Sequence, residues 1–305
     1  MRIFVTGATG FIGSAIVPEL IKAGHQVLGL TRSDAGARSL TAAGAEAHRG
    51  TLEDLESLRA GAAASDGVIH CAFNHDFSKF QENCATDKLA IEALGSVLAG
   101  SDRPLIVSGA VAGLAAPGKV ATEDQVVAPD YPLPRVSEQT TLSLQGVSAS
   151  VVRLPQVHDT VKQGLVTFLI AMARAKGVSA YVGEGRNRWA AAHISDVARL
   201  YRLALEKHQA GAKYHAVAEE GVPMKEIAET IGRGLQVPVV SLSPEKAAEH
   251  FAWLARFAGW DLTASSLQTQ QRLGWRPSGP GLIADLERMN YLESNTFTAS
   301  AARRD

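Results

Sequence analysis

The feature that most constrains the fold is a glycine-rich turn set between an apolar run and a helical pattern at the start of the chain. Residues 2–6 (RIFVT) form a short β-branched run, which is typical of a buried parallel strand. The turn Gly7-Ala8-Thr9-Gly10-Phe11-Ile12-Gly13 follows, and apolar residues then recur at the spacing of one helix face until Gly24. A second strand is expected over residues 26–31. Strand, turn, helix and strand together predict a Rossmann-type unit.

Each glycine of this turn has a separate task in binding a dinucleotide. Gly7 permits the tight turn, Gly10 lets a pyrophosphate approach the backbone, and Gly13 lets the helix pack close to the strand. The helix N-terminus then offers the phosphates free N–H donors and the positive end of its dipole. The residues predicted to bind cofactor here are Gly7, Thr9, Gly10, Phe11, Ile12 and Gly13.

The end of the second predicted strand indicates which dinucleotide is bound. An Asp or Glu at this place usually binds the ribose hydroxyls of NAD(H). This chain has Thr31-Arg32-Ser33 instead, and all three residues are predicted cofactor contacts. Arg32 can pair with a 2′-phosphate, so NADP(H) is favoured over NAD(H). Asp34 is the competing residue, and Arg32 as an ordinary surface cation is the alternative interpretation.

The alternation of strands and helices continues, and it predicts an α/β fold with a doubly wound parallel sheet. Further strands are expected over 45–48, 67–72, 104–107 and 148–154, with helices over 51–60 and 83–99. Because ligands bind at the carboxyl ends of such strands, further cofactor contacts are predicted at Ala72, Phe73, Ser108 and Pro155.

The pattern changes after about residue 160, which suggests a second lobe. Residues 1–160 are predicted to form the NADP(H)-binding Rossmann domain, to which residues 193–218 return with a helix and one more strand. Residues 161–192 and 219–292 are expected to form a smaller, mostly helical substrate lobe, with a loop over 181–189. Residues 293–305 are small and polar and read as a flexible tail.

Composition argues against nucleic-acid and membrane partners, a membrane span and secretion. The net charge of −1 lacks the basic excess expected of a protein that binds nucleic acid or an anionic membrane. No apolar run approaches the ~20 residues of a membrane span, and the first residues carry no signal-peptide pattern. The two cysteines, Cys71 and Cys84, have no metal-ligand spacing and read as reduced buried thiols, so we expect a cytoplasmic protein without a metal.

Residues 6–13 (TGATGFIG) resemble the TGxxGxxG motif of extended short-chain dehydrogenases, the group that includes NAD-dependent epimerases and dehydratases. Five later segments resemble the same family: 68–72, 153–155, 183–188, 193–198 and 273–277. The resemblance therefore spans roughly residues 1–290. It implies a dinucleotide-dependent enzyme that acts on a small molecule. Relatives often form homodimers through the helices after the fourth and fifth strands, although here the second of these, about 137–145, is short and polar.

The catalytic centre departs from this family's pattern. The usual centre is a Ser or Thr after the fifth strand and Tyr-x-x-x-Lys on the next helix. The resemblance points to Ser108 for the hydroxyl, and to Tyr131 and Arg135 in a Tyr-x-x-x-Arg sequence. Two intervening prolines are hard to place inside a helix, and counting back from Glu138 puts Asp130 at the tyrosine. The sequence is therefore similar to atypical short-chain dehydrogenases, in which the Tyr/Lys pair is replaced.

Other side chains are candidates for the missing proton donor and for substrate binding. His75 follows the fourth strand and titrates near neutral pH, with Asp76 beside it in sequence, and His158 follows the sixth strand. For His75 and for His158, each taken alone, the competing interpretation is an ordinary loop histidine without a catalytic role. His70 lies inside a predicted strand and is interpreted as structural. Arg188 matches a phosphate-contacting arginine of the family's epimerases. Aromatic residues suggest an apolar substrate lobe: Phe168, Trp189, Trp253, Phe257 and Trp260.

Three functions follow from these residues. The first is an NADP(H)-dependent oxidoreductase for a small, fairly hydrophobic carbonyl or imine, in which Ser108 with Tyr131 or His75 polarises the substrate oxygen. In it Arg135 holds the ribose or stabilises the alkoxide, and His75, His158, Arg188 and Trp189 contact the substrate. The second is a nucleotide-sugar epimerase or dehydratase with tightly held cofactor. The third is a non-catalytic protein that senses the dinucleotide.

Overall fold

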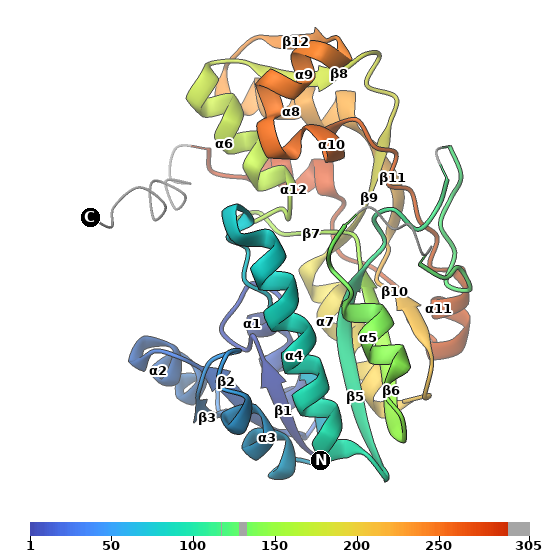
Figure 1. Cartoon of the computed structure of the whole chain (residues 1–305). Coiled ribbons are helices and arrows are strands. Elements are labelled where there is room, and N and C mark those ends of the chain that lie inside the picture. Colours follow the sequence, from blue (N-terminus) through green and yellow to red (C-terminus); the bar gives the residue numbers. More distant parts are fainter. Residues whose placement is uncertain (117, 128–132, 292–305) are drawn as a thin grey trace.

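The computed structural model describes residues 1–116, 118–127 and 133–291. Tyr131, Asp130 and the tail 293–305 lie outside the described residues, so the predictions made for them stay predictions. Figure 1 shows two lobes: a large sheet with helices on both faces, and above it a smaller, mostly helical lobe. No helix in the described part of the chain is long and apolar enough to cross a membrane.

A seven-stranded parallel sheet forms the large lobe, in the order β10-β6-β5-β4-β1-β2-β3. The order reverses between β1 and β4, which is the topological switch point where α/β sheets bind ligands. The strands are β1 (Arg2–Thr6), β2 (Gln26–Thr31), β3 (Glu46–Arg49), β4 (Gly67–His70), β5 (Ser101–Ala110), β6 (Val147–Leu154) and β10 (Lys213–His215).

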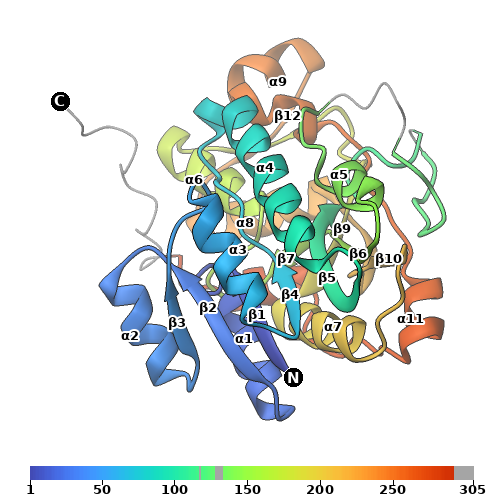
Figure 2. The same cartoon turned by 60° about the horizontal axis from the view of Figure 1, so that its bottom comes forward.

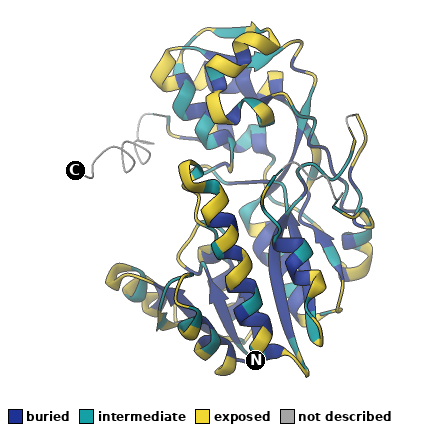
Figure 3. Cartoon of the chain, viewed as in Figure 1, coloured by how far each residue is buried: buried dark blue, intermediate teal, exposed yellow. Residues whose placement is uncertain are grey.

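Helices bury both faces of this sheet, as the continuous apolar strands require. Ile3 and Val5 of β1 point into one core with α1 (Gly13–Lys22) and α7 (Ile194–Glu206), whereas Phe4 points into the opposite core. That second core holds α3 (Leu55–Ala63) and α4 (Phe80–Leu98), which lie side by side in Figure 2, and α5 (Ser137–Ser143) packs against α4. The central strands of the sheet are dark blue (buried) in Figure 3, whereas the outward faces of the helices are largely exposed. This is the doubly wound Rossmann-type fold predicted from the sequence.

The smaller lobe has its own apolar core. A parallel pair joins β8 (Ser179–Val182) to β12 (Val239–Leu242), and a three-stranded sheet in the order β11-β9-β7 connects the lobe to the large sheet. Its strands are β7 (Gln156–His158), β9 (Arg188–His193) and β11 (Glu219–Pro223). The helices are α6 (Val166–Lys176), α8 (Met224–Leu235), α9 (Pro244–Phe251), α10 (Ala255–Ala258) and α12 (Leu282–Arg288), with the 3₁₀ turn η2 (Ala252–Leu254). Helix α11 (Leu267–Leu273) contacts α7 and β10 of the large lobe.

Several boundaries differ from those expected. The predicted loop over 181–189 is shorter, because β8 continues to Val182 and β9 begins at Arg188. The lobe therefore contains strands as well as helices. Helix α2 (Asp34–Ala42) was not predicted, since it buries Leu40 alone and shows little periodicity. A 3₁₀ turn, η1 (Phe77–Lys79), leads into α4.

Candidate functional site

The glycine turn between β1 and α1 has the shape of a dinucleotide cradle. Gly7 adopts a φ of +70°, and a Cβ there would lie 2.7 Å from the Ala72 nitrogen at the end of β4. A Cβ on Gly13 would lie 2.1 Å from the Gly7 oxygen, so the helix can approach the turn only with glycine. A Cβ on Gly10 meets only that same oxygen, at 3.1 Å. The turn is thus tight behind Gly7 and Gly13 and open at Gly10.

The N-terminus of α1 leaves donors available at this turn. The N–H groups of Phe11 and Ile12 donate no hydrogen bond to any residue that the structure describes. No side chain caps the helix, and no acidic residue lies in its first turn. Free donors at a helix N-terminus favour an anion such as a diphosphate. These residues therefore fit the cofactor predicted from the sequence.

The end of β2 presents an unpaired cation. Arg32 is exposed, and no carboxylate of the described chain pairs with its guanidinium, while its competitor Asp34 forms an ion pair with Arg49 of β3. Ser33 caps α2 by accepting a hydrogen bond from the Gly36 nitrogen at 3.1 Å, and Thr31 is buried. A Cβ on Gly36 would lie 3.2 Å from the Thr9 methyl group, so the start of α2 lies against the glycine turn.

Arg135 reaches the carboxyl ends of β4 and β5 from the segment before α5. Its guanidinium carbon lies 4.2 Å from the centre of the Phe73 ring, which is a cation–π distance. Its Nε donates to the Ser137 hydroxyl at 2.9 Å, and a terminal nitrogen donates to the Ser108 carbonyl at 3.3 Å. Arg135 and Phe73, predicted separately from the sequence, therefore lie together.

A series of buried hydrogen bonds connects Arg135, through Ser137, to side chains beneath the site. Ser137 donates on to Asp87 of α4, whose second oxygen lies 3.1 Å from His70 Nε2, and His70 Nδ1 lies 2.8 Å from the Thr6 hydroxyl. Burial alone raises the pKa of Asp87, but the hydrogen bond and charge of His70 and the charge of Arg135 leave it below its ordinary value. A buried carboxylate thus anchors the arginine, and His70 is structural, as predicted.

His75 lies next to Arg135 and Phe73. Its ring meets that of Phe73 edge to face, with centroids 5.3 Å apart. Burial lowers the pKa of His75 below 6.5, and the Arg135 charge lowers it further. Asp76 does not orient this histidine, because its carboxylate accepts hydrogen bonds from the Ser78 nitrogen and hydroxyl and so caps η1.

Ser108 lies inside β5, two residues before the strand ends, and is 4% exposed. Its hydroxyl donates to the His70 carbonyl at 3.0 Å and lies 2.6 Å from the Tyr201 hydroxyl of α7. Because the single hydroxyl proton of Ser108 is donated to the His70 carbonyl, the Tyr201 hydroxyl is the donor in the second bond. The role predicted for Ser108 with substrate stays a prediction, and it would require one of these bonds to break.

An aromatic cluster extends from this site to the small lobe. It starts at Phe73 and Phe80, continues to Phe77 of η1, and crosses to Trp253, which stacks on Phe77 with centroids 4.2 Å apart, and to Phe168 of α6. Trp253 is 40% exposed, so the cluster reaches the surface. Of the aromatic residues predicted for the substrate lobe, Phe168 and Trp253 lie here, whereas Phe257 and Trp260 pack together against the lobe core.

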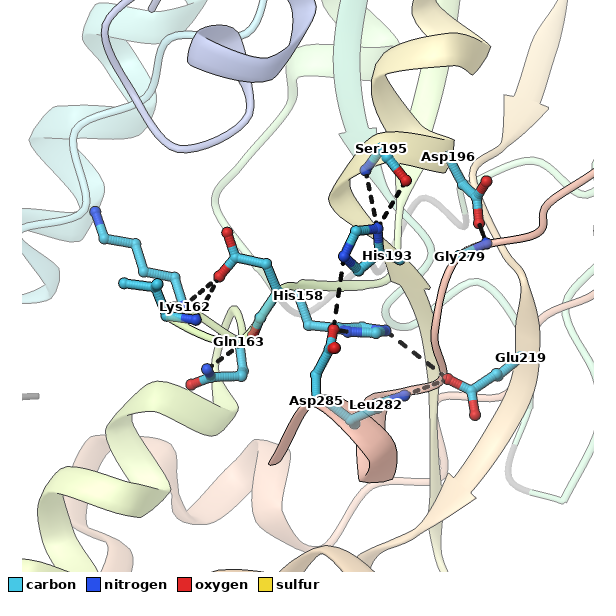
Figure 4. A network of polar contacts seen from close by, with 12 residues as sticks. His158, Lys162, Gln163, His193, Ser195, Asp196, Glu219, Gly279, Leu282 and Asp285 are labelled. Carbon is cyan, nitrogen blue, oxygen red and sulfur yellow. Dashed lines mark hydrogen bonds and ion pairs between the residues drawn. The ribbon is translucent and has the colours of Figure 1, made fainter. Parts of the chain in front are cut away.

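His158 belongs to a different, buried cluster, shown in Figure 4. Its Nδ1 lies 2.7 Å from an Asp285 oxygen, its Nε2 lies 3.8 Å from Glu219, and His193 lies 3.8 Å from the same Asp285 oxygen. Burial lowers the pKa of His158, although Asp285 opposes that change. His158 is fully buried, and the cluster joins β7, β9, β11 and α12. No contact among the described residues links it to Arg135. Pro155 lies half-buried between β6 and β7.

Arg188 and Trp189 lie on β9, and no contact among the described residues joins either of them to Arg135 or His75. The Arg188 backbone and guanidinium both contact Asp261, the latter at 3.4 Å. Trp189 is fully buried in the lobe core. Their predicted contacts with substrate stay predictions, and a phosphate at Arg188 would compete with Asp261.

Comparison with known proteins places the chain in a family. Residues 3–95 match the NAD dependent epimerase/dehydratase family. An uncharacterized protein of Schizosaccharomyces pombe is 54% identical over 94% of this chain and 98% of its own length. A 2-alkyl-3-oxoalkanoate reductase of Stenotrophomonas maltophilia is 30% identical over 79% and 77%. DesIV, a dTDP-glucose 4,6-dehydratase from Streptomyces venezuelae crystallised with NAD and TYD bound, superposes with a TM-score of 0.75 at 18% identity, covering 97% and 98% of the chains.

The chain belongs to the NAD-dependent epimerase/dehydratase family of extended short-chain dehydrogenases. Relatives named as reductases, dehydrogenases and epimerases make it a member of an enzyme family that uses dinucleotides. The resemblance read from the glycine turn and the later segments is thereby confirmed.

Sequence reasoning missed four residues of the site: Phe77, Phe80, Asp87 and Ser137. Asp87 lies inside a long helical pattern and Ser137 at a helix start, where polar residues are ordinary. Phe77 and Phe80 follow the fourth strand closely in sequence. Their position after a strand end was the signal that could have identified them as site residues.

Proposed function

We propose that the chain is an NADP(H)-dependent oxidoreductase that interconverts a small, fairly hydrophobic ketone, aldehyde or imine with its alcohol or amine. The observation that carries this proposal is the arginine and histidine pair, Arg135 and His75, at the carboxyl ends of β4 and β5 beside the glycine turn. The 2-alkyl-3-oxoalkanoate reductase relative supports a ketone that bears an alkyl chain.

NADPH, when bound, supplies a hydride for the substrate carbon. The turn from Gly7 to Gly13 and the α1 N-terminus would hold its diphosphate, and Arg32 its 2′-phosphate. Arg135 stays charged at any working pH, so its guanidinium can stabilise the oxyanion that develops on the substrate. It cannot readily exchange protons, so a second group is needed.

His75 is the proposed proton donor in reduction and acceptor in oxidation. It lies in the same apolar, aromatic surroundings as Arg135, and the low dielectric there strengthens both electrostatic contributions. Phe73, Phe77, Phe168 and Trp253 would exclude water and contact the apolar part of the substrate. The free thiols of Cys71 and Cys84 suit a reducing compartment, and we propose that the enzyme acts in the cytoplasm.

The epimerase alternative is less well supported by the residues. A nucleotide-sugar phosphate at Arg188 would have to share the guanidinium with the Asp261 carboxylate. An epimerase also regenerates its cofactor within each cycle, whereas a reductase consumes NADPH in proportion to product. Net loss of NADPH absorbance with a ketone substrate therefore separates these functions.

Calorimetric titration of the purified protein with NADPH and with NADH tests the cofactor. NADPH is expected to bind at least about tenfold more tightly than NADH, and Arg32→Asp is expected to abolish that difference, since it removes the partner of the 2′-phosphate. Arg59→Asp is the control, because Arg59 pairs with Glu56 on α3. Equal binding would favour an NAD enzyme of the epimerase kind, and no binding would leave a Rossmann scaffold without this activity.

A further inference from the structure

A lysine from the segment between β7 and α6 reaches the glycine turn. The Lys162 ammonium lies 5.9 Å from the centre of the Phe11 ring, within the range of a cation–π contact. Phe11 directly follows Gly10, and its N–H is one of the free donors at the start of α1. The side chain therefore brings a positive charge from the segment between β7 and α6 to Phe11 of the glycine turn.

The backbone around Lys162 is held by its own hydrogen bonds. One carboxylate oxygen of Asp159 accepts from the Val161 and Lys162 nitrogens, at 2.6 and 2.7 Å. The fully buried Gln163 donates to the Asp159 carbonyl at 3.0 Å. A fixed backbone lowers the entropy cost of holding a long side chain toward one target.

Within the described part of the chain, the Lys162 ammonium contacts the Phe11 ring and has no anionic partner. The Asp159 carboxylate is engaged with backbone nitrogens, and no described carboxylate forms an ion pair with the ammonium. In Figure 4 the side chain points away from the cluster of His158 and Asp285. Lys162 is half-buried, so leaving a charge there without a partner has a cost that an anion would remove.

We propose that Lys162 is a cofactor-binding residue that pairs with the diphosphate of the dinucleotide over Phe11. This inference rests on the proposed function, since it needs a dinucleotide in the glycine turn. Arg32, at the end of β2, would recognise the 2′-phosphate, and Lys162 would recognise the diphosphate that NADPH and NADH share. The two cations therefore have separable effects.

The test is calorimetric titration of Lys162→Met and Lys162→Arg with NADPH and with NADH. Lys162→Met is expected to weaken both by about tenfold and to leave their ratio unchanged, whereas Arg32→Asp changes the ratio. Lys162→Arg, which keeps the charge, is expected to bind within about threefold of the original protein. Lys22→Met is the control, because Lys22 is exposed at the far end of α1.

Each outcome decides between the two proposals. If the original protein binds neither dinucleotide, the proposed function and this inference both fail. If it binds and Lys162→Met binds equally well, or if the variant changes only the ratio of NADPH to NADH, the role of Lys162 is wrong and the cofactor assignment stands. Thermal unfolding without ligand checks that both variants fold, and a loss of binding that Lys162→Arg does not recover also contradicts the proposal.

Discussion

The guanidinium of Arg135 lies 4.2 Å from the ring of Phe73. This contact joins the segment before α5 to the end of β4 and brings the arginine to the edge of the sheet where the strand order reverses. The Tyr-x-x-x-Lys lysine of related enzymes lies on a helix, whereas Arg135 lies before α5 and is held by Ser137 and the Ser108 carbonyl. In the proposed function a permanent charge would stand in place of a titrating one, and another residue would transfer the proton.

Arg135→Met should lower kcat for ketone reduction by about 100-fold, since it removes the donor that stabilises the developing oxyanion. Arg135→Lys should recover part of that loss, because it keeps the charge without the planar guanidinium. The measurement is steady-state NADPH oxidation with the best ketone of a panel. Arg186→Met is the control, because the Arg186 side chain is 85% exposed and pairs with Glu184. An unchanged kcat in Arg135→Met would exclude the arginine from catalysis.

His75 should control how the rate depends on pH. Burial, and then the Arg135 charge, hold the pKa of His75 below 6.5, so the imidazole is neutral at neutral pH. Reduction needs the protonated ring, so kcat for reduction should fall as pH rises through this pKa. Oxidation needs the neutral ring, so its rate should rise through the same range and then level off.

His75→Asn should remove this dependence in both directions. Arg135→Lys should leave the pKa of His75 depressed. Arg135→Met should shift the pH at which the rate changes to a higher value, because it removes a neighbouring cation. His208→Asn is the control, since His208 contacts Ser148 at the other end of β6. A profile that His75→Asn leaves intact would assign the proton to a different group.

The parts predicted correctly from the sequence are those that depend on neighbours in the chain. The strand over 26–31 and the tight turn at Gly7 and Gly13 follow from local patterns of apolar residues and glycines. The contacts that build the candidate site depend on tertiary packing, since Ser137 and Asp87 are 50 residues apart and Ser108 and Tyr201 are 93 apart. No periodicity within one segment encodes such pairs.

Two variants, Tyr201→Phe and Ser108→Ala, should together separate a structural role of Ser108 from a catalytic one. The variant removes the hydrogen bond that Ser108 accepts and should cost about 1 kcal/mol of stability, since both side chains are buried. If Ser108 only supports the sheet, Ser108→Ala should lower the unfolding midpoint and leave kcat within about twofold. A drop in kcat of about 100-fold in Ser108→Ala, with stability preserved, would instead support contact with the substrate.

Acid should destabilise the fold through His215. This residue accepts a hydrogen bond from Arg153 at Nε2, 3.0 Å away, and donates from Nδ1 to the Ser265 carbonyl, which requires the neutral ring. Burial, and then the Arg153 charge, lower the pKa of His215 from 6.5 to about 4. The unfolded chain therefore binds a proton at a higher pH than the folded one, and stability falls as pH drops below about 6.5.

The gap between these two pKa values corresponds to about 3 kcal/mol in full, of which about 2 kcal/mol is lost between pH 7 and pH 5. His215→Gln can keep both hydrogen bonds and cannot titrate, so its free energy of unfolding in urea should decline much less over that range. His158 and His75, whose pKa values burial also lowers, contribute to the decline that remains. His25→Gln is the control, since His25 is half-buried beside Glu206. Equal acid losses in His215→Gln and the original protein would show that Arg153 and His215 adapt to protonation by moving apart.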